Sequence, residues 1–239
     1  MRNRQVAALL DDAGIATLTA LAAAELALRA GIPPGVINIV TSDGPGSIEV
    51  GKVFCASDVV RHISFTGSTE VGRILMAQSA PTIKKMSLEL GGNAPFIVFN
   101  DADIDSAVEG AFASKYRNAG QTCVCSNRFY VQEGAYERFV AEFVKKTQAL
   151  KVGDGMQADT RMGPLVSTSQ RDDVLEKVAL LRTQAERVHG NPDDFTVHGA
   201  DAAKGAFLPP MLFHCADPDS ATHVHDTEAF GPVSTVMPY

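Results

Sequence analysis

The sequence predicts an α/β protein built on parallel strands, with two lobes. Short apolar runs at 36–40 and 95–99 are bounded by turn residues, which is typical of strands that are buried on both faces. Segments with apolar residues at helical spacing, such as 69–79, separate these runs. Gly91-Gly92 interrupts the pattern near the middle of the chain, so we expect the boundary between the two lobes there.

The first lobe is expected to begin with a helix over 17–30. That segment is rich in Ala and Leu, and Gly31 followed by Pro33-Pro34-Gly35 ends it. Gly44-Pro45-Gly46 is interpreted as a turn. The remaining elements expected in this lobe are a helix at 69–79 and strands at 36–40, 61–66 and 84–90.

The second lobe continues the alternation. Asp101 or Asp103 is expected to cap a helix that runs to about Asn118. Strands are expected at 95–99 and 128–131, and further helices at 136–150 and 167–188. From Asn191 onward the chain is rich in Pro, Asp and His, so we expect loops and short strands.

Composition excludes several classes of protein. The 239 residues carry a formal net charge of −7, which leaves no broad basic surface for nucleic acid. Hydrophobic residues make up 45%, enough for a core. The apolar run at 6–10 is too short for a signal peptide and ends at Asp11-Asp12, and Glu25 and Arg29 interrupt the stretch 15–30, so neither a signal peptide nor a membrane span is expected. Four irregularly spaced cysteines do not form a disulfide framework, and we expect a reducing, cytoplasmic location.

Cys123, in Gly-Gln-Thr-Cys-Val-Cys, is a candidate nucleophile. A thiol in a small, polar loop after a helix can attack a substrate if its surroundings favour the thiolate. A buried structural cysteine is the more common alternative. Cys125 also raises the possibility of zinc, but no second cysteine pair completes a site.

Glu89, in Leu-Glu-Leu-Gly-Gly, is a candidate general base. A carboxylate in an apolar strand is costly to bury without a function or a partner, and partial burial raises its pKa. The alternative is that strand alternation points Glu89 to solvent, and the pattern does not separate the two.

Residues 65–72 form a candidate anion-binding turn. Their sequence, Phe-Thr-Gly-Ser-Thr-Glu-Val-Gly, predicts a strand, a glycine turn and the start of a helix, where backbone N–H groups can bind an anion. The glycine spacing differs from the usual dinucleotide fingerprint.

Residues 101–105 resemble the start of a calcium loop, but Ser106 and Phe112 stand where Gly and Glu are needed, which favours helix capping. Residues 214–215 with 223–226 match no standard zinc spacing.

Four motifs in order resemble the aldehyde dehydrogenase superfamily: FTGSTEVG, LELGGNAPFIVF, NAGQTCVCSNR and TEAFGPV, with Cys123 placed 34 positions after Glu89. The resemblance covers the chain after about Leu18, whereas residues 1–15 do not match well. The first two-thirds resembles succinate-semialdehyde dehydrogenase. The last third resembles the aldehyde dehydrogenase domain of the phenylacetate ring-opening bifunctional enzyme.

The resemblance implies oxidation of an aldehyde to an acid with NAD or NADP. Cys123 stands where the family has its nucleophile, and Glu89 stands at the general base. Arg117 stands where succinate-semialdehyde enzymes pair the substrate carboxylate, on the helix before the nucleophile. Cys125 matches a redox-partner cysteine found in some of them.

The resemblance also implies cofactor contacts. Gly67, Ser68 and Gly72 match the segment that lies against the dinucleotide pyrophosphate. Glu228 and Phe230 match the pair that holds the nicotinamide ribose and ring. Residues 1–90 are then expected to form a partial, Rossmann-like dinucleotide-binding domain, and residues 91–239 a catalytic domain that is incomplete at its C-terminal end.

Family members are about twice as long as this chain, so we expect a fragment or a shortened gene product. A small-molecule aldehyde is the expected partner, with no nucleic acid and no membrane. Full-length members form homo-oligomers, which leaves the assembly of this chain open. Two alternatives to the dehydrogenase remain: a non-catalytic remnant, and an esterase-like activity that uses Cys123 without a cofactor.

Overall fold

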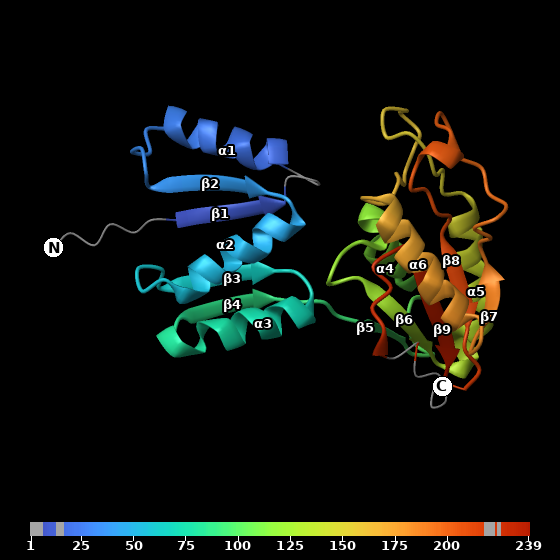
Figure 1. Cartoon of the computed structure of the whole chain (residues 1–239). Coiled ribbons are helices and arrows are strands. Elements are labelled where there is room, and N and C mark those ends of the chain that lie inside the picture. Colours follow the sequence, from blue (N-terminus) through green and yellow to red (C-terminus); the bar gives the residue numbers. More distant parts are fainter. Residues whose placement is uncertain (1–6, 13–16, 218–222, 224–225) are drawn as a thin grey trace. The chain divides into compact units, whose positions relative to one another are not determined.

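A computed structural model describes residues 7–12, 17–217, 223 and 226–239 (Figure 1). The chain forms two compact units, Met1–Leu90 and Gly91–Tyr239, which divide at the Gly91-Gly92 break. Both units combine helices with parallel strands, as the alternating pattern predicts. The segment 223–226, which was compared with zinc sites in the sequence, lies partly outside the described residues, because 224 and 225 are among those not described.

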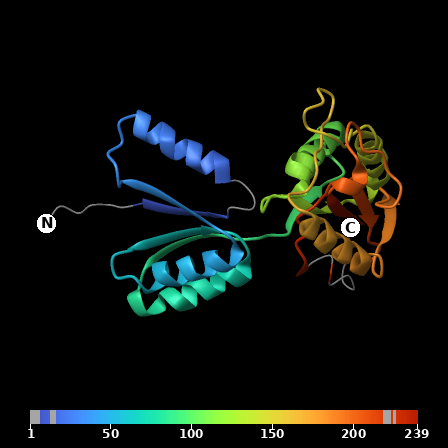
Figure 2. The ribbon, with the colours of Figure 1, turned by 45° about the horizontal axis from the view of Figure 1, so that its top comes forward.

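The first unit contains two separate pairs of parallel strands with helices on both sides. Helix α1 covers one side, and α2 and α3 lie side by side on the other (Figures 1 and 2). The paired strands are β1 (Ala7–Asp12) with β2 (Ile37–Ser42), and β3 (His62–Thr66) with β4 (Lys85–Glu89). The helices are α1 (Thr17–Arg29), α2 (Gly44–Ala56), α3 (Thr69–Ser79) and the short η1 (Ala80–Thr82).

Two elements of the first unit differ from the sequence expectation. Gly44-Pro45-Gly46 is the first turn of α2 and not an isolated turn: the Asp43 carboxylate accepts a hydrogen bond from the Gly46 N–H at 2.9 Å. Proline fits this position because its missing N–H has no partner in the first helical turn anyway. Strand β1 was not expected, since its apolar run is short and ends in two aspartates.

The second unit is built on a five-stranded sheet in the order β5-β6-β9-β8-β7, in which only β7 is antiparallel. Helices α4 and α5 cover one face, and α6 lies on the other (Figure 1). The strands are β5 (Ala94–Val98), β6 (Ser126–Val131), β7 (Glu186–His189), β8 (Met211–His214) and β9 (Val233–Pro238). The helices are α4 (Ile104–Tyr116), α5 (Glu133–Gln148), α6 (Thr168–Leu181) and the short η2 (Arg117–Gly120) and η3 (Ala202–Lys204).

The core of the second unit is aromatic. Phe129 of β6 packs against Phe139 and Phe143 of α5, with ring centroids 6.0 and 5.1 Å apart, and all three side chains are fully buried. Asp103 caps α4 by accepting hydrogen bonds from the Asp105 and Ser106 N–H groups. This confirms helix capping over a calcium loop for the 101–105 segment.

The last predicted helix is too long. Helix α6 ends at Leu181, and Glu186–His189 forms β7, which pairs with β8. Buried residues on α6 stop at Leu181, so nothing apolar holds a longer helix against the sheet. The region after Asn191 contains the expected loops, but also β8 and β9, whose side chains are almost all buried.

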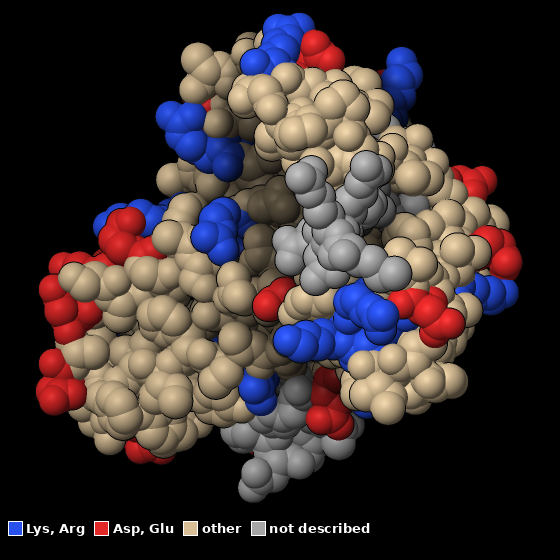
Figure 3. Space-filling view, turned by 90° about the vertical axis from the view of Figure 1, so that its left-hand side faces the viewer, with Lys and Arg blue, Asp and Glu red and all other residues tan. Residues whose placement is uncertain are grey.

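Basic and acidic side chains lie interspersed among uncharged ones on the face drawn in Figure 3. Within the described part of the chain, no helix is long and apolar enough to cross a membrane. The same residues contain no cluster of His, Cys, Asp or Glu that could hold a metal ion.

Candidate active site

The segment before Cys123 has an unusual backbone. Helix α4 ends at Tyr116, and three consecutive residues then adopt left-handed conformations: Asn118 at φ 53°, Ala119 at φ 54° and Gly120 at φ 75°. Two of these carry side chains, and such conformations are costly away from glycine. The Asn118 and Gln121 side chains each donate a hydrogen bond to the other residue's carbonyl oxygen, at 3.1 and 3.0 Å, which holds the turn.

Glycines bring three backbone segments together at this turn. A Cβ on Gly120 would lie 2.2 Å from the Gly231 carbonyl oxygen, and one on Gly92 would lie 3.1 Å from the Cys123 carbonyl oxygen. A Cβ on Gly91 would lie 2.3 Å from Oε2 of Glu228. The nucleophile loop, the Gly91-Gly92 break and the Glu228 loop therefore meet in one place within the second unit.

Accessibility distinguishes the four cysteines, all of which are free thiols. Cys123 is partly exposed, whereas Cys55, Cys125 and Cys215 are buried. The Cys125 Sγ donates to the Lys115 carbonyl oxygen at 3.5 Å. Burial raises the pKa of the Cys215 thiol, which makes this group inert at neutral pH.

The loop that carries Glu228 and Phe230 is also held by side chains of the same unit. Gln170 donates to the Phe230 carbonyl oxygen at 3.1 Å, and Phe230 adopts a left-handed φ of 47°. The Glu228 Oε1 atom is buried and has no hydrogen-bond partner among the described residues. A buried acceptor without a donor is costly, so this atom fits a ligand that supplies a hydroxyl group.

The predicted pyrophosphate segment lies in the first unit, where β3 passes into α3. Ser68 caps α3 by accepting from the Val71 N–H at 3.3 Å, and the Gly67 N–H donates to the Glu89 carbonyl oxygen at 3.0 Å. A Cβ on Gly72 would lie 2.8 Å from Cδ2 of Leu90, so this glycine leaves room for the end of the Leu90 side chain. The start of α3 can accept an anion, although Glu70 already occupies its first turn.

Two predicted site residues have exposed side chains. Glu89 ends β4 opposite Thr66 and is exposed, so of the two orientations that the sequence left open the structure shows the solvent-facing one. Arg117 follows the end of α4 instead of lying on it, and its side chain is exposed as well. The roles of both residues remain predictions.

Lys115 is a functional candidate that the sequence reasoning missed. Its side chain is fully buried, and Nζ donates to Oδ1 of Asn127 at 2.7 Å. Burial lowers the pKa of Lys115 to about 8, against the opposing effects of Cys125 and Glu228. A signal was available: buried Ile104, Val108 and Ala111 precede Lys115 at helical spacing, which places it on the core side of α4.

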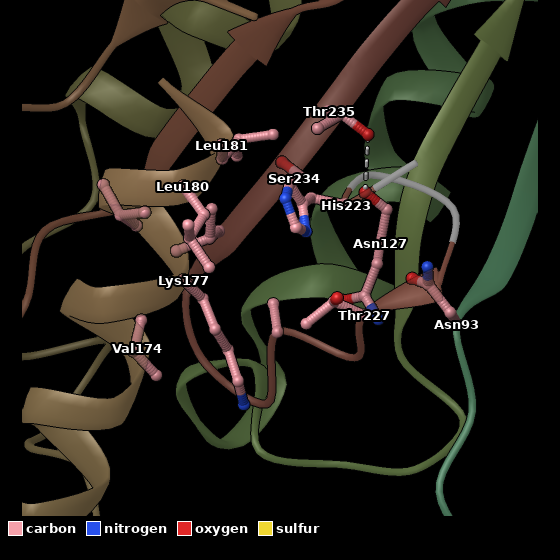
Figure 4. A pocket seen from close by; sticks show the side chains of 13 residues that line it. Asn93, Asn127, Val174, Lys177, Leu180, Leu181, His223, Thr227, Ser234 and Thr235 are labelled. Carbon is pink, nitrogen blue, oxygen red and sulfur yellow. Dashed lines mark hydrogen bonds between the residues drawn. The ribbon is translucent and has the colours of Figure 1, made fainter. Parts of the chain in front are cut away.

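A cavity lies between α6 and β9, with about 490 Å³ of space including what is open to solvent (Figure 4). Lys177, Leu180 and Leu181 of α6 line one side. Asn127 and Thr235 line the other, where Thr235 Oγ1 donates to the Asn127 carbonyl oxygen at 3.4 Å. None of the predicted site residues lines this cavity.

The sequence matches the aldehyde dehydrogenase family over residues 8–239. The chain belongs to this family. The match begins at residue 8, so it includes all but the first residue of strand β1 and corrects the expectation that the resemblance starts near Leu18.

The family relatives include several semialdehyde dehydrogenases. Succinate-semialdehyde dehydrogenase [NADP(+)] GabD of Escherichia coli strain K12 is 46% identical over 95% of this chain and 45% of its own length. The mitochondrial succinate-semialdehyde dehydrogenase of Oryza sativa subsp. japonica is 46% identical over 93% of this chain and 40% of its own length. The glutarate-semialdehyde dehydrogenase of Pseudomonas aeruginosa is 46% identical over 92% of this chain and 43% of its own length.

Solved aldehyde dehydrogenase structures share the fold. An NADP-dependent enzyme from E. coli gives a TM-score of 0.85 at 44% identity, over 98% of this chain and 46% of its own. An NAD-dependent aldehyde dehydrogenase from Sinorhizobium meliloti gives a TM-score of 0.87 at 31% identity, over 98% of this chain and 44% of its own. The chain thus spans less than half the length of these relatives, and the α/β, partial aldehyde dehydrogenase fold is confirmed.

Proposed function

We propose that this chain provides the nucleophile and part of the cofactor site of an NAD- or NADP-dependent aldehyde dehydrogenase, with succinate semialdehyde as its substrate. The observation that carries the proposal is Cys123: among the described residues it is the one cysteine with a partly exposed side chain. It follows the left-handed turn at 118–120, beside the Glu228 loop. Relatives that act on succinate semialdehyde align over more than nine-tenths of the chain.

The chemistry starts at the Cys123 sulfur, which bonds to the aldehyde carbon and gives a thiohemiacetal. The backbone N–H of Cys123 is assigned to help hold the oxyanion that forms on the former carbonyl oxygen. Loss of hydride leaves a thioester on Cys123. Glu89 is assigned as the base that takes a proton from the water that hydrolyses this thioester to the acid.

The residues present fit a dinucleotide. NAD or NADP, when bound, supplies the acceptor for the hydride. Glu228 offers a buried carboxylate oxygen that lacks a donor, which suits a ribose hydroxyl, and Phe230 is assigned to the nicotinamide ring. Gly67, Ser68 and Gly72 are assigned to the pyrophosphate, because the start of α3 presents backbone N–H groups beside a serine cap.

The substrate class rests on Arg117. Its guanidinium is exposed six residues before Cys123 and can form a bidentate pair with a carboxylate. A semialdehyde that carries a carboxylate opposite its reactive end fits this arrangement. Glutarate semialdehyde, named for one relative, has the same two groups with a longer spacer.

The proposal is tested by assaying the chain with succinate semialdehyde and either NAD or NADP. We expect aldehyde-dependent cofactor reduction that Cys123→Ser abolishes and that Glu89→Gln reduces. Val124→Ala, at an exposed neighbouring position, serves as the matched control and should keep full activity. Absence of cofactor reduction by the wild-type chain, or equal rates for the Cys123→Ser and wild-type chains, would contradict the proposal. Ester hydrolysis without cofactor reduction would instead favour the esterase-like alternative.

A further inference from the structure

The side chain of Gln121 joins the loop that carries Cys123 to a distant segment of the second unit. Its Nε2 donates to the Asn118 carbonyl oxygen at 3.0 Å, within the left-handed turn. Its Oε1 accepts from the backbone N–H of Val166 at 2.9 Å, 45 residues further along the chain. Gln121 lies two positions before the reacting sulfur, and the proposed chemistry does not use it.

A side-chain amide suits both partners of Gln121. The Asn118 carbonyl oxygen accepts a hydrogen and the Val166 N–H donates one, and an amide offers a donor and an acceptor. A carboxylate would have no hydrogen for Asn118, and a hydrocarbon side chain would leave the Val166 N–H without this acceptor. The residue type therefore matches a link between the two segments.

The segment around Val166 is anchored on both sides of that residue. Leu165 is buried, and its N–H donates to the Ala206 carbonyl oxygen at 2.8 Å. Ser167 caps α6 by accepting from the Gln170 N–H at 3.1 Å. The bond from the Val166 N–H therefore ties the loop that carries the reacting cysteine to a fixed point.

Cys123 itself lies between two held positions of its loop. Gln121 is held on one side. On the other, the Cys125 N–H donates to the Thr122 carbonyl oxygen at 3.1 Å, and the Cys125 side chain is buried. The Cys123 N–H has no acceptor among the described residues. Its direction is therefore set by the neighbouring residues and not by a hydrogen bond of its own.

We propose that Gln121 is a positioning residue: by tying the turn before Cys123 to Val166, it directs the Cys123 N–H toward the oxyanion that forms when the sulfur attacks a carbonyl carbon. This inference rests on the proposed function, which assigns that N–H to the oxyanion. Gln121 touches neither the substrate nor the sulfur in this assignment. Its effect passes through the backbone of Thr122.

The decisive experiment compares two reactions of Cys123 in the whole chain, of which only one forms an oxyanion. Acylation by 4-nitrophenyl acetate passes through a tetrahedral oxyanion before 4-nitrophenolate leaves, whereas alkylation by iodoacetamide displaces iodide at a saturated carbon. Gln121→Met removes the amide and should slow acylation at least about fivefold. The alkylation rate should stay within about twofold of the wild type, because it depends on the thiolate and its exposure.

Both rates are measured over the first turnover and assigned to Cys123 by subtracting the rates of Cys123→Ser. If Gln121 only stabilises the fold, its loss should change alkylation as well, since unfolding alters the exposure of the thiol. A smaller fall in the acylation rate of Gln121→Met, or an alkylation rate outside the twofold range, overturns the proposal.

Gln132→Met is the matched control. The Gln132 Oε1 accepts from the Asn100 N–H at 2.8 Å, so this variant also removes an amide that joins two separate segments of the second unit. Because these segments do not carry the nucleophile, both rates should remain at the wild-type values. A fall in acylation as large as that in Gln121→Met would assign the effect to general destabilisation and overturn the proposal.

Val166→Pro tests the same hydrogen bond from its other end, which keeps the proposal testable if Gln121→Met does not fold. Proline removes the N–H that donates to Gln121 and leaves the loop of Cys123 unaltered in sequence. The Val166 side chain is exposed, and Val166→Ala, which keeps the N–H, should behave like the wild type. A wild-type acylation rate in Val166→Pro overturns the proposal.

Cofactor reduction separates this inference from the proposed function, since neither test reaction needs NAD or NADP. If the wild-type chain reduces neither cofactor with succinate semialdehyde, the proposed function fails, while the two rates still decide the role of Gln121. If it does reduce one, Gln121→Met should lower kcat at least about fivefold and leave KM for the cofactor within about twofold. A rise in that KM with an unchanged kcat overturns the assignment of Gln121 to the oxyanion.

Discussion

At the scale of single residues, the exposure of the four thiols predicts which one reacts. Iodoacetamide at limiting concentration should modify Cys123 first, because the other three cysteines are buried. Peptide mapping by mass spectrometry measures the distribution of the label. Preferential modification of Cys55 or Cys215 would contradict this assignment, and denatured protein, in which all four should react, is the control.

Arg117 gives a second prediction at this scale. Arg117→Ala should raise KM for succinate semialdehyde about ten- to a hundredfold, because a lost charge-assisted pair costs roughly 1.5–3 kcal/mol. A neutral aldehyde of similar length should be little affected. Arg138→Ala, which removes an exposed arginine on α5, is the control. Equal effects of Arg117→Ala on both aldehydes would make Arg117 structural and remove the basis for an acidic substrate.

Single residues also show where sequence reasoning fails. Cys123 was predicted from its motif, because a small, polar loop before a cysteine is a local feature. The exposure of Glu89 could not be decided, since strand alternation fits a buried and a solvent-facing carboxylate equally. Lys115 was missed because a lysine in the last turn of a helix is ordinary, and its hydrogen bond to Asn127 depends on how α4 packs against β6.

At the scale of elements, the left-handed turn before Cys123 depends on Gly120. Gly120→Ala should lower the free energy of unfolding by about 3 kcal/mol or more, because a Cβ would collide with the Gly231 carbonyl oxygen at a φ of 75°. Urea unfolding measures the loss. Gly155→Ala, where a Cβ meets no atom within 4 Å, should change stability by less than about 1 kcal/mol. Similar effects at both glycines would contradict the close packing of the two loops.

Elements with strong local signals were predicted well. Helix α3 matches the expected 69–79, since Ser68 caps it and apolar spacing defines its length. Strand β4 shows the expected alternation within 84–90. Strand β7 was assigned to a helix because its four residues carry no strand pattern of their own and form a strand only by pairing with β8.

At the scale of the whole molecule, the two units differ in core size. Among the apolar side chains whose burial the structure describes, only Cys55 and Ile63 are buried in the first unit, and all the other buried ones belong to the second. Amide hydrogens of the first unit should therefore exchange faster, because few buried contacts oppose its local unfolding. Hydrogen exchange with mass spectrometry measures this difference. Equal protection of β3 in the first unit and β6 in the second would contradict the expectation.

Sequence patterns also predicted the architecture at this scale, with limits. Alternating strands and helices indicated α/β units, and Gly91-Gly92 marked a break, because both are local features of composition and spacing. The strand order β5-β6-β9-β8-β7 could not be predicted in this way. It brings β9, more than a hundred residues later, between β6 and β8, and a pairing over such a distance leaves no local signal.

The central claim is that Cys123 carries the acyl group of an aldehyde whose hydride passes to NAD or NADP. The most direct measurement mixes the chain with succinate semialdehyde and cofactor, quenches the reaction in acid within the first turnover, and maps the acyl group by mass spectrometry. The account predicts a succinyl thioester on the Cys123 peptide, formed together with the reduced cofactor and enriched in Glu89→Gln. Reduced cofactor without an acyl group on Cys123, or an acyl group on another residue, would contradict it.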